Sequence, residues 1–303
     1  MMYLDSRCVW GRLATAHSVV NSQIMNSMHP KLKMLVFTDL DGCLLDHHDY
    51  SYQPAIELLQ KLQFENIPVI PTTSKTESEV RHLRKSLANE HPFIIENGAA
   101  VFIPKGYFPE APKDCIETDG FWIKEFTKSR QHWLSMISQT NLSTDKFQTF
   151  SESTISDIVK LTGLDHDAAV RASNRRYGEP IAWYGTEAEK QQFIAELKRS
   201  GANVMQGGRF LHVSGNCNKG KALNWLTDQY KGILRELVLT VAIGDSQNDI
   251  TMLEMANIAV LIPSPSHPLP QIVKPQYVYT ASQQGPSGWV ESVSMILNTL
   301  YIQ

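Results

Sequence analysis

Apolar runs of strand length alternate with amphipathic segments of helix length near the N-terminal end of the chain. Strand-like runs at 34–38, 67–73 and 92–96 are separated by helix-like segments at 53–66 and 76–90. This alternation requires parallel strands joined by crossover helices, and it places helices on both faces of the sheet. We therefore predict an α/β fold with a Rossmann-like parallel-sheet core.

The same alternation returns near the C-terminal end. A helix-like segment at 218–230 leads to a strand-like run at 237–245, and a second helix–strand pair follows at 247–257 and 258–262. The last segment, 285–303, has the period of a closing helix. Both ends of the chain are thus predicted to contribute strands to one core.

The segment between these two halves follows a different pattern. From about 109 to 213 the strand-like stretches are short and less apolar, and amphipathic helices are predicted at 154–163 and 186–201. We predict that residues 33–108 and 214–303 form the α/β core. Residues 109–213 would then form an inserted α+β domain.

The composition is that of a globular protein, with 42% hydrophobic and 19% charged residues among 303. A formal net charge of −3 gives no electrostatic reason to expect a nucleic acid or an anionic membrane as partner. No apolar run approaches the ~18 residues of a membrane-spanning helix. Residues 1–32 lack the apolar stretch and cleavage site of a signal peptide. We predict that they are a poorly ordered extension or an over-long start.

The cysteines are scattered and form no C-x-x-C pair, which argues against a zinc site or a disulfide framework. They are Cys8, Cys43, Cys115 and Cys217. Reduced thiols and a cytoplasmic location are the simplest interpretation.

Two aspartates follow the first predicted strand, in the stretch VFTDLDGCLL. Asp39 and Asp41 are two positions apart, so in an extended chain their side chains point the same way while Leu40 points into the core. Gly42 allows a sharp turn directly after them. Ligands of open α/β sheets bind at the carboxyl ends of the strands, which is where these two carboxylates are predicted to lie.

A second acidic pair occurs in VAIGDSQNDI, where Asp245 ends another apolar run and Asp249 follows four residues later. If the two strands are neighbours, four carboxylates meet around one point and repel each other unless a cation lies among them. An all-oxygen set suits Mg²⁺, which takes few carboxylates and keeps positions for water and phosphate. The sequence therefore predicts a Mg²⁺ site formed by Asp39, Asp41, Asp245 and Asp249.

Groups that favour an anion occur at two more predicted element ends. VIPTTSK offers the hydroxyl groups of Thr73 and Ser74, and SGNCNKGKAL offers the ammonium group of Lys219 at a helix start. Acid pair, hydroxyl, lysine and second acid pair together describe a phosphoryl-transfer site.

Each of these signals has a plainer explanation when it stands alone. A single D-x-D is usually a solvated loop or a helix cap, and Lys219 resembles any solvated helix start. Thr73 is compatible with an ST-turn, and GDSQND with a turn before a helix. The order of all four on an α/β pattern is what favours the phosphoryl-transfer site.

The stretches DLDGCLL, TTSK, NKGKAL and GDSQND resemble the four motifs of the haloacid dehalogenase superfamily of phosphatases. The inserted segment between the second and third motifs resembles the C2-type cap of that superfamily. The resemblance extends from about Lys33 to the end of the chain. One position departs from the pattern, since Cys43 stands where the superfamily usually has Thr; we expect a local effect and no loss of chemistry.

A narrower resemblance is to the mannosyl-3-phosphoglycerate phosphatase family, whose enzymes release phosphate from that sugar-acid ester. It is carried by TTSKTESEV, FIIENGAAVFIP, RASNRRYGEP, GGRFLHVSG and GPSGW. The resemblance implies a small phosphorylated sugar-acid as substrate and Mg²⁺ as the cofactor, and it leaves the oligomeric state open.

The resemblance also implies roles for the core residues. Asp39 would attack phosphorus and form an aspartyl-phosphate, and Asp41 would protonate the leaving oxygen and later accept a proton from water. Thr73 and Lys219 would hold the phosphoryl oxygens. Asp39, the backbone carbonyl of Asp41 and Asp245 would bind Mg²⁺, with Asp249 acting through water or by orienting Asp245.

A phosphoglycerate carries a carboxylate besides its phosphate, so we expect an arginine in the substrate site. RASNRRYGEP offers Arg171, Arg175 and Arg176, and the predicted site contains Arg171 and Arg176. Further residues expected to face the substrate are Ser74, Asn97, Gly98, Gly208 and Arg209.

Other functions remain open from the sequence. The same chemistry could act on glucosyl-3-phosphoglycerate or a hexose phosphate, and a phosphomutase is a weaker option. Paired carboxylates also serve glycosidases, and receiver domains gather similar residues. A phosphosugar sensor without catalysis is the alternative outside enzymes.

Overall fold

The computed structural model describes residues 32–301 except 142, 208, 235–236 and 274–276. The prediction for residues 1–32 therefore lies, apart from Leu32, outside the described residues, and so does the predicted site residue Gly208.

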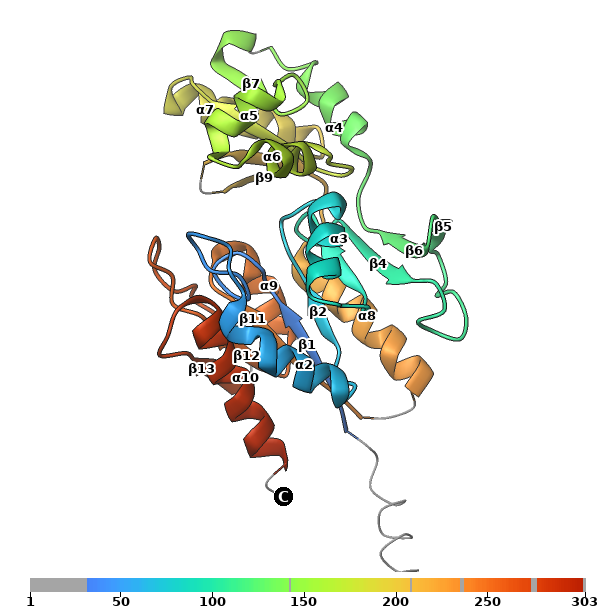
Figure 1. Cartoon of the computed structure of the whole chain (residues 1–303). Coiled ribbons are helices and arrows are strands. Elements are labelled where there is room, and N and C mark those ends of the chain that lie inside the picture. The colour runs from blue at the N-terminus through green and yellow to red at the C-terminus, as the bar shows by residue number, and fades with distance from the viewer. Residues whose placement is uncertain (1–31, 142, 208, 235–236, 274–276, 302–303) are drawn as a thin grey trace, which may run out of the picture.

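A five-stranded parallel sheet forms the centre of the molecule, with the order β13-β12-β11-β1-β2. The central pair is β1 and β11, in which Val36 lies beside Val241. Seen in Figure 1, β1 runs from the uncertain N-terminal trace toward the upper part of the molecule. The bounds are β1 Leu32–Thr38, β2 Val69–Pro71, β11 Leu237–Gly244, β12 Ile258–Leu261 and β13 Tyr277–Thr280.

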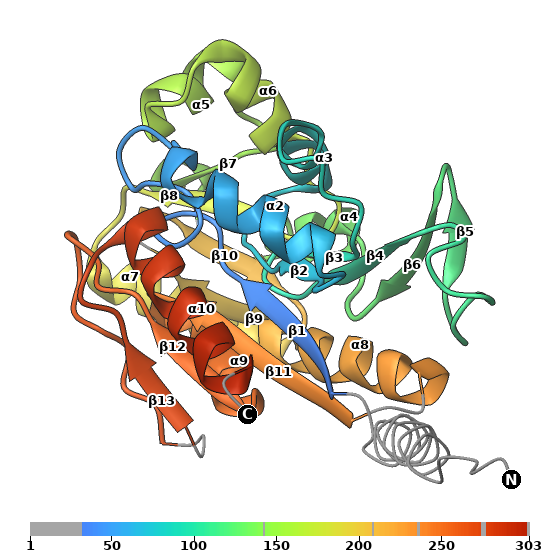
Figure 2. The same cartoon turned by 60° about the horizontal axis from the view of Figure 1, so that its bottom comes forward.

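Helices cover both faces of this sheet because alternate strand residues point to opposite sides. Val36 joins the cluster under α2, α3 and α10, whereas Leu35 and Phe37 join the cluster under α8 and α9. Both clusters are fully buried around β1, and Figure 2 shows the sheet between the two helix layers. The bounds are α2 Ile56–Phe64, α3 Glu77–Ser86, α8 Lys219–Leu234, α9 Ile250–Met255 and α10 Gly285–Tyr301, with η1 Gln53–Ala55 and η3 Gln247–Asp249. The predicted α/β fold class is confirmed.

A second, antiparallel sheet has the order β3-β4-β6-β5. An isolated bridge between Thr72 and Ile94 links it to the parallel sheet. Its strands are β3 Phe93–Ile95, β4 Ala100–Pro104, β5 Ile116–Thr118 and β6 Phe121–Glu125.

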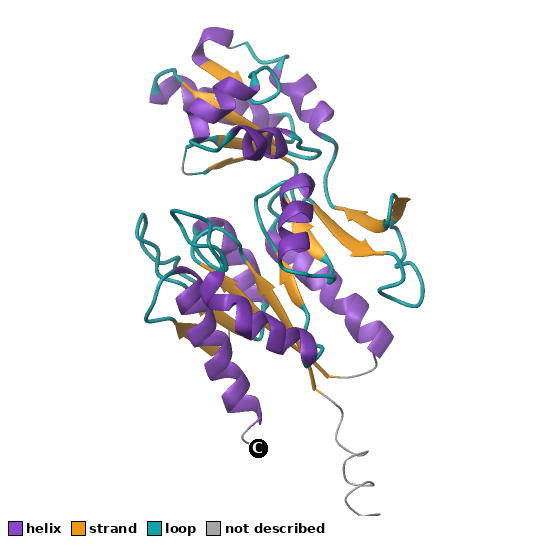
Figure 3. Cartoon of the chain, viewed as in Figure 1, coloured by secondary structure: helices purple, strands orange, loops and turns teal. Residues whose placement is uncertain are grey.

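A third sheet, with the order β7-β8-β10-β9, lies beyond the end of the parallel sheet together with four helices (Figures 1 and 3). Its apolar core is separate from the two clusters around β1. The bounds are α4 Arg130–Ile137, η2 Thr144–Lys146, β7 Phe147–Thr149, α5 Ile155–Thr162, α6 His166–Ser173, β8 Glu179–Trp183, α7 Glu187–Arg199, β9 Asn203–Gln206 and β10 Leu211–Ser214.

The division at residue 109 stays a prediction, and we propose to move it. β5 and β6 follow residue 109 but pair with β4 of the second sheet. Backbone pairing makes these two strands part of the core, so we place the inserted unit at 127–214 and call this range the cap from here on.

None of the helices in the described parts of the chain is long and apolar enough to cross a membrane.

Candidate active site

Three carboxylates meet at the carboxyl ends of β1 and β11. Asp39 follows β1 and Asp245 follows β11, and the parallel register places these strand ends side by side. Asp249 comes from the turn after Asp245. One ligand oxygen from each of the three lies within 4.8 Å of the others, and all three residues are buried.

Gly42 makes this close approach possible. Its φ of +78° is a conformation that residues with a side chain rarely adopt. A Cβ atom at this position would lie 2.7 Å from Asp245 Oδ2. The turn after the first acid pair therefore needs glycine for two reasons, its backbone angle and the space it leaves for Asp245.

Lys219 is the cation of the cluster and is wholly buried. Its Nζ lies 2.9 Å from Asp39 Oδ1 and 2.6 Å from Asp249 Oδ1. Because α8 begins at Lys219, the helix start directs the side chain to the strand ends. The prediction of Lys219 and the two acidic motifs as neighbours agrees with this geometry.

Burial and repulsion from neighbouring carboxylates make Asp39 and Asp245 hard to ionise. Burial and the charge of Asp249 raise the pKa of Asp39 to about 8, and burial together with Asp249 raises the pKa of Asp245 to about 6. For Lys219, burial alone would lower the pKa, but the charges of Asp249 and Asp39 outweigh it and raise the pKa. One ammonium group does not balance three buried carboxylates, so a divalent cation with oxygen ligands fits this donor set.

Asp41 lies beside this cluster with a different partner. Its Oδ2 is 2.9 Å from Lys75 Nζ, and its buried Oδ1 has no hydrogen-bond partner among the residues that the structure describes. Asp41 is not among the three clustered carboxylates. Lys75 also faces the ring of Tyr50, with Nζ 5.1 Å from the ring centroid. One oxygen of the Asp41 carboxyl is thus paired with Lys75, and the other has no hydrogen-bond partner among the described residues.

The polar residues of the second motif line the same region. Thr73 is buried, and its Oγ1 accepts a hydrogen bond from the backbone N–H of Lys75 (3.2 Å). Asn97 Oδ1 accepts a hydrogen bond from Asn248 Nδ2 (3.0 Å), which ties the loop after β3 to the turn after β11.

A hollow of about 650 Å³ lies over this region, between the core and the cap. Most of the residues that line it are neutral and polar, although much of the surface they expose is apolar. The core supplies Ser74, Asn97, Ser246, Gln247, Asn248, His267 and Pro268, and the cap supplies Met205, Gln206, Gly207 and His212. Ser74 and Asn97 thus lie where a substrate would reach the aspartates.

The three cap arginines of RASNRRYGEP point in three directions. Arg171 lines a separate hollow on the outer face of α3. Arg176 is bound to Glu77 (Nη1 to Oε2, 2.9 Å) and lies over the ring of Phe102. Neither of these two predicted substrate ligands lines the hollow over the aspartates.

Arg175 does not line the hollow either, but it is the arginine of the three that is bound to a lining residue, Ser74. Its Nη2 donates to the backbone oxygen of Ser74 (3.1 Å). Burial and, to a smaller extent, the charge of Arg175 lower the pKa of His212 to about 4. The Arg175 side chain is only 8% exposed, and Nε has no hydrogen-bond partner although Glu96 Oε2 is 3.5 Å away.

Glu96 holds the arginine loop against the core. Its carboxylate accepts hydrogen bonds from the backbone N–H groups of Arg176, Tyr177 and Gly178, at 2.8, 3.2 and 2.8 Å. The side chain is 1% exposed. The loop that carries Arg175 is therefore placed by one buried carboxylate of the core.

Two further predicted substrate residues have other surroundings. Arg209 donates to the backbone oxygens of Leu161 and Thr162, and so holds the C-terminal end of α5. Gly98 is buried, with a φ of +87°, and a Cβ there would lie 2.1 Å from the backbone oxygen of Asn218. Their predicted contact with substrate gains no support, because both lie outside the lining of the hollow.

Sequence reasoning missed Lys75, Glu96 and His267. Lys75 stands in the TTSK motif and Glu96 in ENGA, so both were within reach of a motif-based argument. His267, whose Nε2 is 3.3 Å from Asp245 Oδ2, lies in the loop after β12 and had no sequence signal. Cys43 is close as well, with Sγ 3.8 Å from Asp245 Oδ1.

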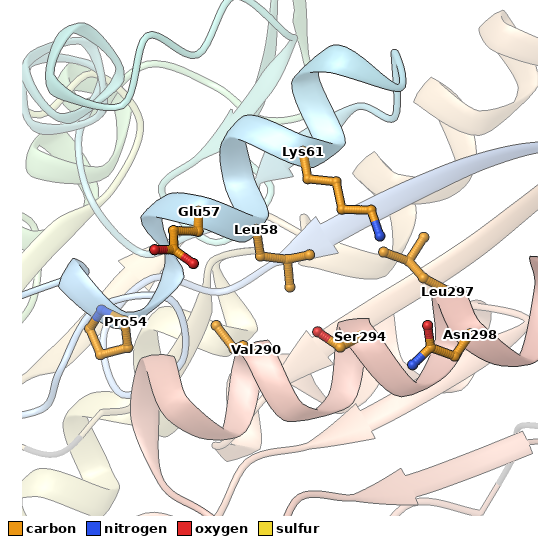
Figure 4. Close-up of a pocket in the computed structure, with 8 residues that line it drawn as sticks. All are labelled: Pro54, Glu57, Leu58, Lys61, Val290, Ser294, Leu297 and Asn298. Carbon is orange, nitrogen blue, oxygen red and sulfur yellow. The ribbon is translucent and has the colours of Figure 1, made fainter.

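Another hollow, of about 500 Å³, lies between α2 and α10 (Figure 4). Glu57 and Lys61 line it from α2, and Ser294 and Asn298 from α10. It shares no residue with the hollow over the aspartates and gathers no group of carboxylates.

The chain is similar to known proteins over most of its length. The family described as haloacid dehalogenase-like hydrolase matches residues 36–277. A protein of Persephonella marina named glucosyl-3-phosphoglycerate/mannosyl-3-phosphoglycerate phosphatase is 38% identical over 279 residues, 88% of this chain and 98% of its own. A protein of Methanococcoides burtonii with the same name is 35% identical over 263 residues, 86% of this chain and 96% of its own.

The fold also resembles solved structures. A protein of Thermotoga maritima superposes with a TM-score of 0.58 and 19% identity, over 89% of this chain and 97% of its own. At this identity the likeness concerns the fold alone.

Proposed function

Because the chain belongs to the haloacid dehalogenase-like hydrolases and is a phosphatase of phosphoric monoesters, we propose that it removes phosphate from a glycosyl-3-phosphoglycerate. The sugar would be mannose or glucose, as in the names of the two relatives. The observation that carries this proposal is the similarity to the Persephonella relative, which spans 98% of its length.

The hollow over the aspartates supports a sugar-acid substrate. The amide side chains of Gln206, Gln247 and Asn248 line it and suit the hydroxyl groups of a sugar. Arg175 is hydrogen-bonded to the backbone of Ser74, which lines this hollow. A planar guanidinium matches a carboxylate with two parallel hydrogen bonds, so we assign the glycerate carboxylate to Arg175 rather than to Arg171 or Arg176.

Asp39 is the proposed nucleophile. Its carboxylate would attack phosphorus and form an aspartyl-phosphate while the bond from phosphorus to the glycerate oxygen breaks. Asp41 would give its proton to that oxygen through Oδ1, the atom without a partner in the structure. In the second half, Asp41 would take a proton from the water that attacks the aspartyl-phosphate. Lys75 keeps the other oxygen of Asp41 fixed.

Lys219 and Thr73 are the proposed holders of the phosphoryl group. Lys219 reaches Asp39 with its full charge in a dry site, where electrostatic stabilisation is strongest. Mg²⁺, proposed to be bound by Asp39, the backbone carbonyl of Asp41, Asp245 and Asp249, would supply positive charge beside the phosphoryl oxygens. Asp249 also accepts hydrogen bonds from the backbone N–H groups of Asp245 and Ser246, which fixes the turn.

The test is phosphate release with Mg²⁺ from mannosyl-3-phosphoglycerate, glucosyl-3-phosphoglycerate, 3-phosphoglycerate and glucose 6-phosphate, with and without EDTA. We expect the two glycosyl-phosphoglycerates to be hydrolysed with kcat/KM at least tenfold above the others, and EDTA to abolish release. Equal rates on glucose 6-phosphate would reject the substrate class and keep the phosphatase. Undiminished release in EDTA would reject the metal.

A further inference from the structure

A second hollow between core and cap lies on the outer face of α3, with a volume of about 440 Å³. Five of its lining residues come from α3, where spacings of three and four place them on one face. The cap adds Arg171 and Asn174 from the end of α6. The α3 residues are Glu77, Ser78, Arg81, His82 and Lys85. None of these residues lines the hollow over the aspartates.

Positive charge around this hollow exceeds its local negative charge. Glu77 is shared by two guanidinium groups, those of Arg81 (3.0 Å) and Arg176 (2.9 Å). Within the described part of the chain, the side chains of Lys85 and Arg171 have neither an ion pair nor a hydrogen bond. The whole chain has a formal net charge of −3, so this excess is a property of the hollow and not of the protein surface in general.

The two walls of the hollow belong to different parts of the molecule. α3 is part of the core, and α6 is part of the cap. The hydroxyl of Thr76, at the start of α3, donates to the backbone oxygen of Arg171 (2.8 Å), which brings the two helices together. A ligand that contacts both walls binds only while α6 lies on α3, so its binding stabilises this contact.

We propose that this hollow binds a small anion with two or more negative charges, carried by phosphate or carboxylate groups, and that the bound anion holds the cap on the core. Arg171 and Lys85 supply the two unpaired cations from opposite walls. Arg81 supplies a third, since Glu77 can remain with Arg176. The proposal does not depend on the substrate of the phosphatase, because it concerns other residues.

The experiment measures hydrogen exchange of residues 166–174 in the full chain as sulfate is added, with chloride keeping ionic strength constant. We expect sulfate to slow exchange at least threefold in a saturable way. Lys85→Gln/Arg171→Gln should abolish the slowing, since each substitution removes one unpaired cation. Lys198→Gln/Arg199→Gln is the matched control, because it removes one lysine and one arginine from an exposed end of α7 and should keep the response.

Several outcomes would overturn the proposal. One is unchanged exchange in the wild-type chain, and another is equal slowing in Lys85→Gln/Arg171→Gln, which would assign the effect to sulfate in the phosphoryl site. Lys85→Arg/Arg171→Lys keeps both charges and should keep most of the response. A loss of response in that variant as well would assign the effect to local packing and reject charge recognition.

Discussion

The acidic cluster of the core and the arginine loop of the cap gather charge by different means. Asp39 and Asp245 each follow a buried parallel strand, so the register of β1 and β11 brings their carboxylates together. Arg171, Arg175 and Arg176 lie within six residues of one another, yet their side chains point in three directions. The ends of two paired strands determine where the side chains that follow them meet. The side chains of a loop are positioned only by the contacts that the loop makes with other parts of the protein.

The largest effect should come from replacing Asp39, the proposed nucleophile. Asp39→Asn keeps the shape and the hydrogen bond from Lys219 but removes the attacking charge, so kcat should fall by about 10⁴-fold or more. Phosphate release from mannosyl-3-phosphoglycerate is the measurement. Glu110→Asn, at an exposed carboxylate outside the cluster, is the control. Activity within tenfold of wild type in Asp39→Asn would mean that the cluster does not carry the chemistry.

The next largest effect should come from Lys219. Lys219→Met keeps the length and apolar stem of the side chain but removes the charge between Asp39 and Asp249, so kcat should fall by about 10²- to 10³-fold. Repulsion within the cluster would rise, and Mg²⁺ should then raise the melting temperature by more than it does in wild type. Equal kcat in Lys219→Met and in the exposed variant Lys198→Met would contradict the role.

The sequence could predict which core acids come together, because strand–helix alternation and the ends of elements are local properties. The apolar runs predicted β1 and β11. Because these strands are parallel neighbours, Asp39 and Asp245, which follow them directly, lie side by side at the carboxyl ends of the two strands. The carboxyl ends of parallel strands are also where this fold class binds ligands. Thr76 and Glu79 form a capping box at the start of α3 for the same local reason.

The cap arginines could not be placed in this way because their positions depend on long-range contacts. Arg176 is directed by Glu77, 99 residues earlier, and Arg175 by the backbone oxygen of Ser74, 101 residues earlier. The later start that we propose for the cap rests on a similar contact: β6 pairs with β4 across a proline-rich connection that resembles a linker. No periodicity in the sequence encodes either contact.

The arginine assignment gives the third prediction. Arg175→Met should raise KM for a glycosyl-3-phosphoglycerate by about 10- to 100-fold, since a hydrogen bond to a charged group is worth about 1.5–3 kcal/mol. Hydrolysis of glucose 6-phosphate, which has no carboxylate, should change little. Arg209→Met is the matched control, because Arg209 holds α5 and lies outside the hollow. A larger KM effect in Arg209→Met than in Arg175→Met would restore the sequence-based assignment.

The smallest predicted effect concerns how the arginine loop is held. Glu96→Gln leaves one carbonyl oxygen where the carboxylate accepts three backbone hydrogen bonds, and it turns an amide group toward N–H donors. The free energy of unfolding should fall by about 1–3 kcal/mol, measured by urea unfolding. KM should rise less than in Arg175→Met, because Arg175 remains present but is less firmly positioned. Glu110→Gln, on the exposed surface, should change neither quantity. If Glu96→Gln had the same free energy of unfolding and the same KM as Glu110→Gln, the loop would be held without Glu96. The contrast between acids positioned by strand ends and arginines positioned by a bound loop would then be wrong for this loop.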